Sequence, residues 1–230
     1  MKLINALLFA TATLFAASAG ATITRTADMS VVSSTTGLTD TVTTGAEIDG
    51  LKVTAFFSGG FSQTLSWADM SANAGGVSGT GWSLSLAGDS FSQAWKFNIG
   101  AGRGQLQSFI LDASGTGQVT LFDRSFGGKE GTLNSWSGVD FSIGSGCATC
   151  SYVAAYSNAV GLGKAMPVGD LFRTLAVSFT GGTGPSANFT FVQDADNAIR
   201  VAAAVPEPGS LALLSLALLG MGVVLRRRSV

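Results

Sequence analysis

The stretch FSQTLSW at residues 61–67 places a larger side chain at every second position. Phe61, Gln63, Leu65 and Trp67 share one phase of this alternation, and serine or threonine occupies the other phase. Successive side chains of an extended strand point to opposite faces, so a period of two predicts a strand with one face in a core. Residues 61–67 therefore predict a half-buried β-strand.

The same period of two recurs elsewhere in the chain. Large side chains, mostly apolar, alternate with smaller ones at residues 82–86, 91–99, 139–143, 175–179 and 189–191. Glycine-rich breaks separate the runs at residues 58–60, 75–76, 100–104, 115–117, 127–128 and 181–184. Short strands at such spacing are typical of a β-sandwich, and only residues 69–74 predict a short helical turn. The sequence therefore predicts an all-β fold, a single antiparallel β-sandwich, of which a jelly roll is one variant.

The start of the chain has the composition of a targeting segment. A short positive region, MK, precedes a mostly apolar run at residues 3–15, and small residues follow. This pattern predicts a secretory signal peptide over residues 1–21, with cleavage after Ala19 or Ala21. The signal peptide is therefore excluded from the fold.

The other end of the chain has three parts in a fixed order. They are Pro206, Glu207 and Pro208, then an apolar run at residues 211–225, then Arg226, Arg227 and Arg228. The prolines keep the tripeptide extended, and the arginines hold the end of an apolar, membrane-spanning helix on the cytoplasmic side. The run is shorter than the roughly 20 residues of a usual span, so a thin bilayer suits it. Residues 205–230 therefore predict a sorting tail, or alternatively a plain anchor, and residues 22–204 predict the sandwich domain.

The tail resembles the PEP-CTERM sorting signal of Gram-negative bacteria, also known as the ice-binding protein C-terminal domain. The resemblance implies export through the Sec translocon and processing near the Pro-Glu-Pro tripeptide by exosortase, a membrane enzyme. It also implies an inner-membrane-tethered precursor that later reaches the cell surface or extracellular matrix, with a link to exopolysaccharide, biofilm or floc. Residues 81–91, 167–182 and 191–198 resemble stretches in other proteins with this tail, and that likeness implies a sandwich without assigned chemistry.

The net charge of the predicted domain limits its partners. Lys2 and the three final arginines account for four of the 13 basic residues, and Glu207 for one of the 14 acidic ones. The remaining 9 basic and 13 acidic residues leave residues 22–205 with a net charge of −4. A mildly acidic domain without a basic patch predicts no nucleic-acid partner.

The chain contains no histidine, which excludes histidine-based catalytic triads and imidazole metal sites. A carboxylate pair acting on glycans is the enzymatic chemistry that remains open. The candidate carboxylates are Asp89, Asp112, Asp123, Asp140 and Asp170. Aspartate is a common turn residue, so we interpret these five as turn residues and predict neither an enzyme nor a cofactor.

Asp194, Asp196 and Asn197 form the densest group of oxygen ligands in the sequence. Carboxylate and amide oxygens in a loop suit Ca²⁺. The run lacks the spacing of an EF-hand loop, and its glycine and glutamate are missing. A turn or cap is therefore favoured over a calcium site.

Cys147 and Cys150 are the only cysteines of the chain. In an exported protein such a pair favours a disulfide, and a free pair or a zinc site are the alternatives. A disulfide here would hold a turn between the strand of Phe141 and the strand of Tyr152.

Exposed aromatic side chains on a sandwich are typical of glycan-binding surfaces. Trp67, Trp82 and Trp95 share the apolar phase of their strands, so they are predicted to lie in the core. Trp136 and Tyr152 remain as candidate glycan contacts, together with Tyr156. A run of alternating threonines at Thr39, Thr41 and Thr43 is too short for an ice-binding ladder and favours an edge strand.

The sequence as a whole predicts an exported, non-enzymatic β-sandwich that serves a structural or adhesive role at the cell surface. A glycan-binding module is the alternative, and a carboxylate-dependent glycan-degrading enzyme is the third candidate.

Overall fold

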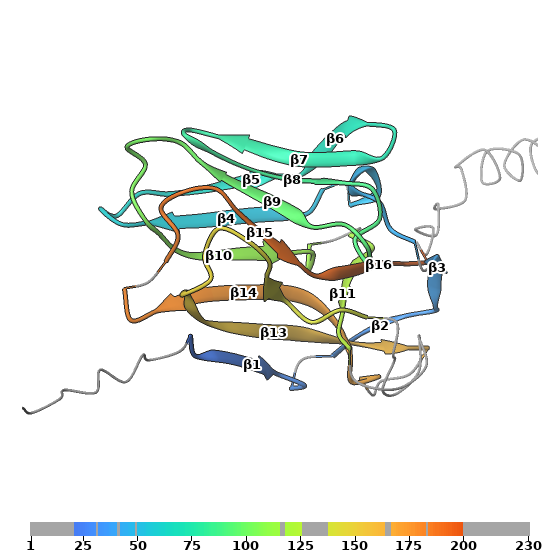
Figure 1. Ribbon diagram of the computed structural model, residues 1–230. Helices are drawn as coiled ribbons and strands as arrows, with labels where there is room; N and C mark the ends of the chain where they lie inside the picture. The colour runs from blue at the N-terminus through green and yellow to red at the C-terminus, as the bar shows by residue number, and fades with distance from the viewer. Residues whose placement is uncertain are drawn as a thin grey trace, which may run out of the picture.

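The computed structural model describes residues 21–199, apart from positions 31, 41, 49, 116–117, 126–137, 164–166 and 183. These residues form two β-sheets that stack as a sandwich, as Figure 1 shows. The larger sheet contains β1 (Ile23–Ala27), β2 (Val32–Thr35), β3 (Leu38–Asp40), β4 (Lys52–Phe57), β5 (Ser62–Ser66), β10 (Leu106–Asp112), β11 (Thr120–Asp123), β13 (Ser151–Leu162), β14 (Leu171–Thr180) and β16 (Asp194–Ala198). The smaller sheet contains β6 (Ala68–Ser71), β7 (Ala74–Gly79), β8 (Trp82–Ala87), β9 (Trp95–Ile99), β12 (Ser142–Ile143) and β15 (Phe189–Val192).

The two long strands β13 and β14 organise the larger sheet. Along one edge of β14 lie β11 and then β10, and β13 pairs with its other edge. The first half of β13 pairs with β1 and its second half with β2. These two pairings are parallel, whereas every other pairing between the described strands is antiparallel. The N-terminal strands therefore cover the edge that the antiparallel sheet would otherwise expose.

The predicted all-β sandwich is confirmed. β5, β8, β14 and β15 each fall on a run with a period of two, and the burial of β8 alternates along the strand as expected. No α-helix lies among the described residues, and the only helical element there is one 3-10 turn, η1 (Gly45–Glu47).

Three local predictions are wrong. Residues 69–74 form the hairpin between β6 and β7, not a helical turn, and Gly75 and Gly76 lie inside β7. Phe91 and Gln93 lie in the turn before β9, where the Phe91 ring is 48% exposed. Of residues 139–143 only Ser142–Ile143 is strand. At Phe91 and Gln93 the alternation of the sequence continues through a turn that backbone hydrogen bonds define, such as the one from the Gln93 N–H to the Asp89 carbonyl oxygen at 2.8 Å.

The core between the sheets is aromatic. Trp67, Trp82 and Trp95 are all buried there, as predicted. Rings from both sheets meet in the middle, where Phe97 of β9 and Phe109 of β10 have centroids 5.6 Å apart. Buried aromatic side chains contribute large apolar areas, and their tilted contacts add about 0.5–1.5 kcal/mol each. The aromatic phase of the strands therefore supplies the packing that holds the two sheets together.

The indole N–H of each of these three tryptophans has a partner. The indole Nε1 of Trp67 donates to the carbonyl oxygen of Gly45 at 2.8 Å. A Cβ on Gly75 would collide with both of these atoms. Glycine is therefore required at position 75, inside a strand, because the indole and the backbone of η1 pass directly over it.

Both predicted terminal segments lie outside the described residues, except for residue 21 of the signal peptide. They are the signal peptide at residues 1–21 and the sorting tail at residues 205–230. In the described part of the chain, no helix has both the length and the hydropathy that a membrane span needs. The last described strand, β16, lies between β3 and β11 in the larger sheet. The described chain therefore leaves the domain from an interior position of the sheet, on the right in Figure 1.

Candidate functional site

A buried polar network joins the two sheets near Tyr156 of β13. The Tyr156 hydroxyl donates to Oε1 of Gln193 at 2.5 Å and accepts from the backbone N–H of Phe141 at 2.8 Å. Nε2 of Gln193 donates to the carbonyl oxygens of Asp123 at 3.0 Å and Asp194 at 2.7 Å. The Trp95 indole donates to the carbonyl oxygen of Gln193 at 2.8 Å. One glutamine therefore connects strands of both sheets.

Two arginines and one aspartate extend this network toward the surface. Nε of Arg124 donates to Asp140 Oδ1 at 2.9 Å, and the Arg124 guanidinium lies 4.6 Å from the centre of the Tyr156 ring. Arg25 of β1 lies 3.8 Å from the same carboxylate and donates to the carbonyl oxygen of Phe141 at 2.8 Å. Burial raises the pKa of the Tyr156 phenol, so it stays neutral and acts as both donor and acceptor. The network of Tyr156, Gln193, Arg124 and Asp140 can hold the two sheets in register, and its hydrogen bonds are made within the fold.

Asp194, Asp196 and Asn197 lie on β16, not in the loop or turn that their sequence predicted. The carboxylate of Asp194 accepts from the Ser90 hydroxyl at 2.9 Å, and both Asp194 and Asp196 are buried. Asn197 accepts from Thr120 Oγ1 at 3.3 Å and donates to the Glu47 carbonyl oxygen at 3.1 Å. The described residues contain no group of three His, Cys, Asp or Glu side chains that could hold a metal ion. The prediction of a turn is therefore wrong, and this stretch belongs to the sheet.

The five single aspartates have different environments. Asp89 caps a turn by accepting from the Phe91 N–H at 3.1 Å, and Asp112 accepts from the Ser114 N–H at 2.8 Å. These two behave as the predicted turn residues. Asp123 and Asp170, in contrast, are fully buried, and Asp140 pairs with arginines. Asp140 and Asp170 still lie in the loop and the bend that precede β12 and β14, so the turn interpretation fails only for Asp123, which is the last residue of β11.

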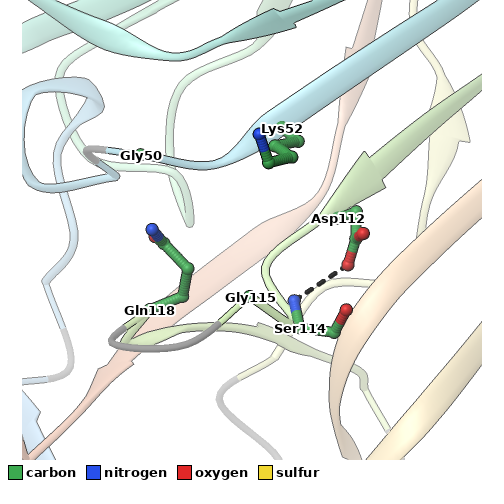
Figure 2. Close-up of a pocket in the computed structure, with 6 residues that line it drawn as sticks. All are labelled: Gly50, Lys52, Asp112, Ser114, Gly115 and Gln118. Atoms are coloured by element: carbon green, nitrogen blue, oxygen red, sulfur yellow. Dashed lines mark hydrogen bonds between the residues drawn. The ribbon is translucent and has the colours of Figure 1, made fainter.

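A pocket of about 230 Å³ opens beside the β4–β10 pair, as Figure 2 shows. It is lined by Gly50, Lys52, Asp112, Ser114, Gly115 and Gln118. Lys52 and Asp112 are register partners on the two strands, so the pocket contains one cation and one carboxylate. Asp112 also accepts from the Thr174 hydroxyl at 3.2 Å, which fixes its side chain. A small polar molecule could form hydrogen bonds here, and the described lining holds one carboxylate.

The two aromatic candidates for glycan contact have different outcomes. Tyr152 is 1% exposed, and its ring packs edge-on against Phe141 with centroids 5.2 Å apart. Contact of Tyr152 with a sugar is therefore a wrong prediction, because the ring shares the inward phase of β13 with Ala154 and Tyr156. Trp136 lies outside the described residues. Tyr156 is buried in the polar network described above.

Cys147 and Cys150 form a disulfide, with their Cα atoms 5.3 Å apart. The Cys150 N–H donates to the Cys147 carbonyl oxygen at 3.1 Å, so the disulfide closes one turn. This turn connects β12 to β13, as the sequence predicted. Cys150 is buried and Cys147 packs against the core, which places the disulfide at the border of the sandwich.

The alternating threonines do not form one ladder. Thr39 lies exposed on β3, whereas Thr43 is buried and accepts a backbone hydrogen bond from Ser90 N–H at its carbonyl oxygen at 2.9 Å. Thr41 lies outside the described residues. The placement of Thr39 on the edge strand β3 agrees with the edge-strand interpretation.

Comparison with known proteins identifies the sorting tail. The family model of the PEP-CTERM protein-sorting motif matches residues 204–228. This range contains the Pro206–Pro208 tripeptide and the arginines at 226–228. No curated protein and no solved structure matches the chain. The functional residues with a family assignment therefore lie in the tail.

Proposed function

We propose that this chain, which belongs to the proteins that carry the PEP-CTERM sorting motif, is a non-enzymatic structural or adhesive component of a bacterial cell surface or extracellular matrix. The motif supports an exported protein that exosortase processes at the membrane. In the proposal, the Sec translocon exports the chain and the tail tethers it to the inner membrane. Processing near Pro208 then releases the sandwich to an exopolysaccharide matrix, biofilm or floc.

The match of the sorting motif to residues 204–228 is the observation that carries the proposal. Exosortase would act where the Pro-Glu-Pro tripeptide stands outside the membrane. The arginines at 226–228 would keep the other end of the tail in the cytoplasm through the positive-inside bias. A sorting tail of this kind supports delivery of the whole preceding domain.

The surface of the sandwich supports a role in a hydrated matrix. Ser62, Thr64 and Ser66 all point outward from β5, and the Thr64 hydroxyl lies 2.8 Å from that of Thr54 on β4. Hydroxyl groups on a flat sheet can exchange hydrogen bonds with water and with sugar hydroxyls. The buried polar groups of Tyr156 and Gln193, in contrast, bond within the fold. This distribution supports adhesion through the surface better than chemistry in the interior.

Mass spectrometry of the secreted protein tests the sorting part of the proposal. The mature chain is expected to end near Pro208, and Glu207→Gln is expected to accumulate the longer, membrane-bound form. Glu130→Gln, outside the motif, is the control and should be processed as the wild type is. A secreted chain that still ends in Val230 would contradict processing.

Fractionation of the extracellular material tests the matrix part of the proposal. The processed domain should sediment with the exopolysaccharide. The wild type and Trp136→Ala should bind to it and dissociate from it to the same extent. Loss of binding only in Trp136→Ala would instead favour a dedicated glycan-binding site. A domain that stays free in the medium in every preparation would contradict a matrix role.

A further inference from the structure

The end of the sandwich from which the tail leaves carries a small apolar cluster of its own. Leu121, Val160, Leu171 and Ala198 are buried there, separate from the main core. Four side chains that pack against this cluster stay partly exposed, and Ile199 beside them is 42% exposed. We name these five residues the exit rim: Leu38, Val119, Leu162, Val168 and Ile199. The exit rim is entirely aliphatic.

Backbone hydrogen bonds hold the exit rim around the departing chain. The Ile199 N–H donates to the Gly37 carbonyl oxygen and the Ala198 N–H to the Val119 carbonyl oxygen, each at 2.8 Å. The Val168 N–H donates to the Val160 carbonyl oxygen at 2.9 Å. The chain is therefore fixed to the sandwich up to Ile199, next to the apolar cluster that the exit rim packs against.

The sequence beyond Ile199 limits how far this end can stand from a bilayer. Twelve steps along the chain separate Ile199 from Leu211, where the apolar run of the tail begins. At ~3.3–3.6 Å per residue, that segment reaches at most about 43 Å when it is fully extended. Such a short tether raises the effective concentration of the exit rim at the membrane to the millimolar range, so a weak apolar contact suffices to hold it there.

The far end of the sandwich provides the comparison. Ile23 of β1 pairs with Tyr152 at the start of β13, whereas Thr35 beside the exit rim pairs with Leu162 at the end of the same strand. Ten steps at about 3.3 Å place these two ends roughly 33 Å apart. Ile23 is 49% exposed, much like Ile199. The two isoleucines therefore have similar exposure at opposite ends of one strand.

We propose that the exit rim rests on the outer surface of the lipid bilayer while the tail holds the precursor there, so that the domain stands on this end until it is processed. The inference rests on the proposed function, because it requires a membrane-tethered precursor. Aliphatic side chains suit the boundary between headgroups and acyl chains, which such surfaces enter by ~5–10 Å. The bilayer is therefore the partner whose chemistry the exit rim fits.

Fluorescence quenching by brominated lipids tests the contact on the precursor with its tail, in vesicles of phosphatidylethanolamine and phosphatidylglycerol. An environment-sensitive dye is attached to Ile199→Cys or, as the matched control, to Ile23→Cys. The native cysteines form a disulfide and leave the introduced thiol as the labelling site. An exit rim that contacts the bilayer lies ~5–10 Å deep in it. Quenching of the dye at position 199 should therefore exceed quenching at position 23 about threefold.

A charged substitution in the exit rim distinguishes contact of the rim with the bilayer from tethering by the tail alone. Val168→Asp is expected to abolish the excess quenching at position 199, and Ile23→Asp is expected to leave it unchanged. If Val168→Asp lowers the melting temperature of the domain, Leu162→Asp replaces it. Equal quenching at both positions, or an excess that survives the charge, would overturn the contact. Loss of processing in cells without any lipid quenching would also overturn it and would indicate contact with the processing enzyme instead.

These results remain distinct from the failure of the proposed function. A wild-type chain that cells neither export nor process contradicts the proposed function itself, whatever the vesicles show. A chain that cells process normally, but whose exit rim shows no excess quenching, contradicts only the inference about the rim.

Discussion

The phenol of Tyr156 donates to Gln193 and accepts from the Phe141 N–H, whereas the Tyr152 hydroxyl, on the same strand and equally buried, has no partner of good geometry in the described residues. Both rings point inward from β13, four residues apart. The chain thus holds two buried phenols that differ in whether the hydroxyl is bonded.

Replacing each tyrosine with phenylalanine should therefore have different effects. Tyr156→Phe leaves the side-chain Oε1 of Gln193 and the Phe141 N–H without their phenol, which should lower the free energy of unfolding by about 1–3 kcal/mol. Tyr152→Phe removes a buried hydroxyl that lacks a good partner and should change the free energy by less than about 0.5 kcal/mol. Urea denaturation of the two variants and the wild type measures both values. Equal losses would contradict the assigned hydrogen bonds.

The stability of the domain should decrease at high pH. Burial raises the pKa of both Tyr152 and Tyr156, so the folded state favours the neutral phenols. This contribution is complete below the unfolded pKa of about 10 and is lost as pH rises above it toward the folded values. The loss should approach about 1.4 kcal/mol per pH unit for a fully buried tyrosine. Denaturation curves from neutral pH to about pH 11 should therefore show a steeper fall for wild type than for Tyr156→Phe, and equal slopes would exclude Tyr156 as the source.

Gly75→Ala should be strongly destabilising although it adds one methyl group. The methyl would collide with the Gly45 carbonyl oxygen and the Trp67 indole nitrogen, which bond each other. Overpacking at such a site should lower the free energy of unfolding by about 3 kcal/mol. Gly115→Ala is the control, since its nearest neighbour is Gln118 Cγ at an ordinary 3.5 Å, and it should stay within about 0.5 kcal/mol. Thermal denaturation of both variants distinguishes the two sites, and similar melting temperatures would contradict the close approach.

Reduction of the disulfide between Cys147 and Cys150 should weaken the domain modestly. The closed loop is short, so the loss of constraint on the unfolded chain corresponds to about 2 kcal/mol. Thermal denaturation with and without reductant should show this decrease in wild type. The double variant Cys147→Ser and Cys150→Ser should match the reduced wild type and should not respond to reductant. A response in the double variant would show that the reductant acts elsewhere.

Strands with a large apolar phase could be predicted from the sequence. The tryptophans of β8 and β9 alternate with small or polar residues, and the free energy of burying such rings fixes which face turns inward. β16 could not be recognised in this way. Its aspartates are matched by partners far along the chain, such as Ser90, and a local pattern does not contain that information. β1 was missed for a related reason, since all its residues are exposed and backbone pairing with β13 holds it.

The candidate functional features also differ in how far the sequence alone predicts them. The sorting motif is a contiguous signal, and the sequence alone suffices to find it. The pocket beside Lys52 and Asp112 arises only when two strands pair in register, and Gln118 reaches it from a later segment. The sequence leaves Tyr152 as a candidate glycan contact because a tyrosine suits a surface or a core, and only its packing against Phe141 decides between them.

The position of β16 between β3 and β11 has a consequence for the order of assembly. A chain that is delivered across a membrane from its N-terminus presents β3 long before its neighbour exists. In the proposed export, the sheet would therefore close only when residues 194–198 have emerged, as the sorting tail itself enters the translocation apparatus. Completion of the fold and arrival of the sorting signal thus coincide in time, and a domain truncated before β16 would reach the outside with its larger sheet still open.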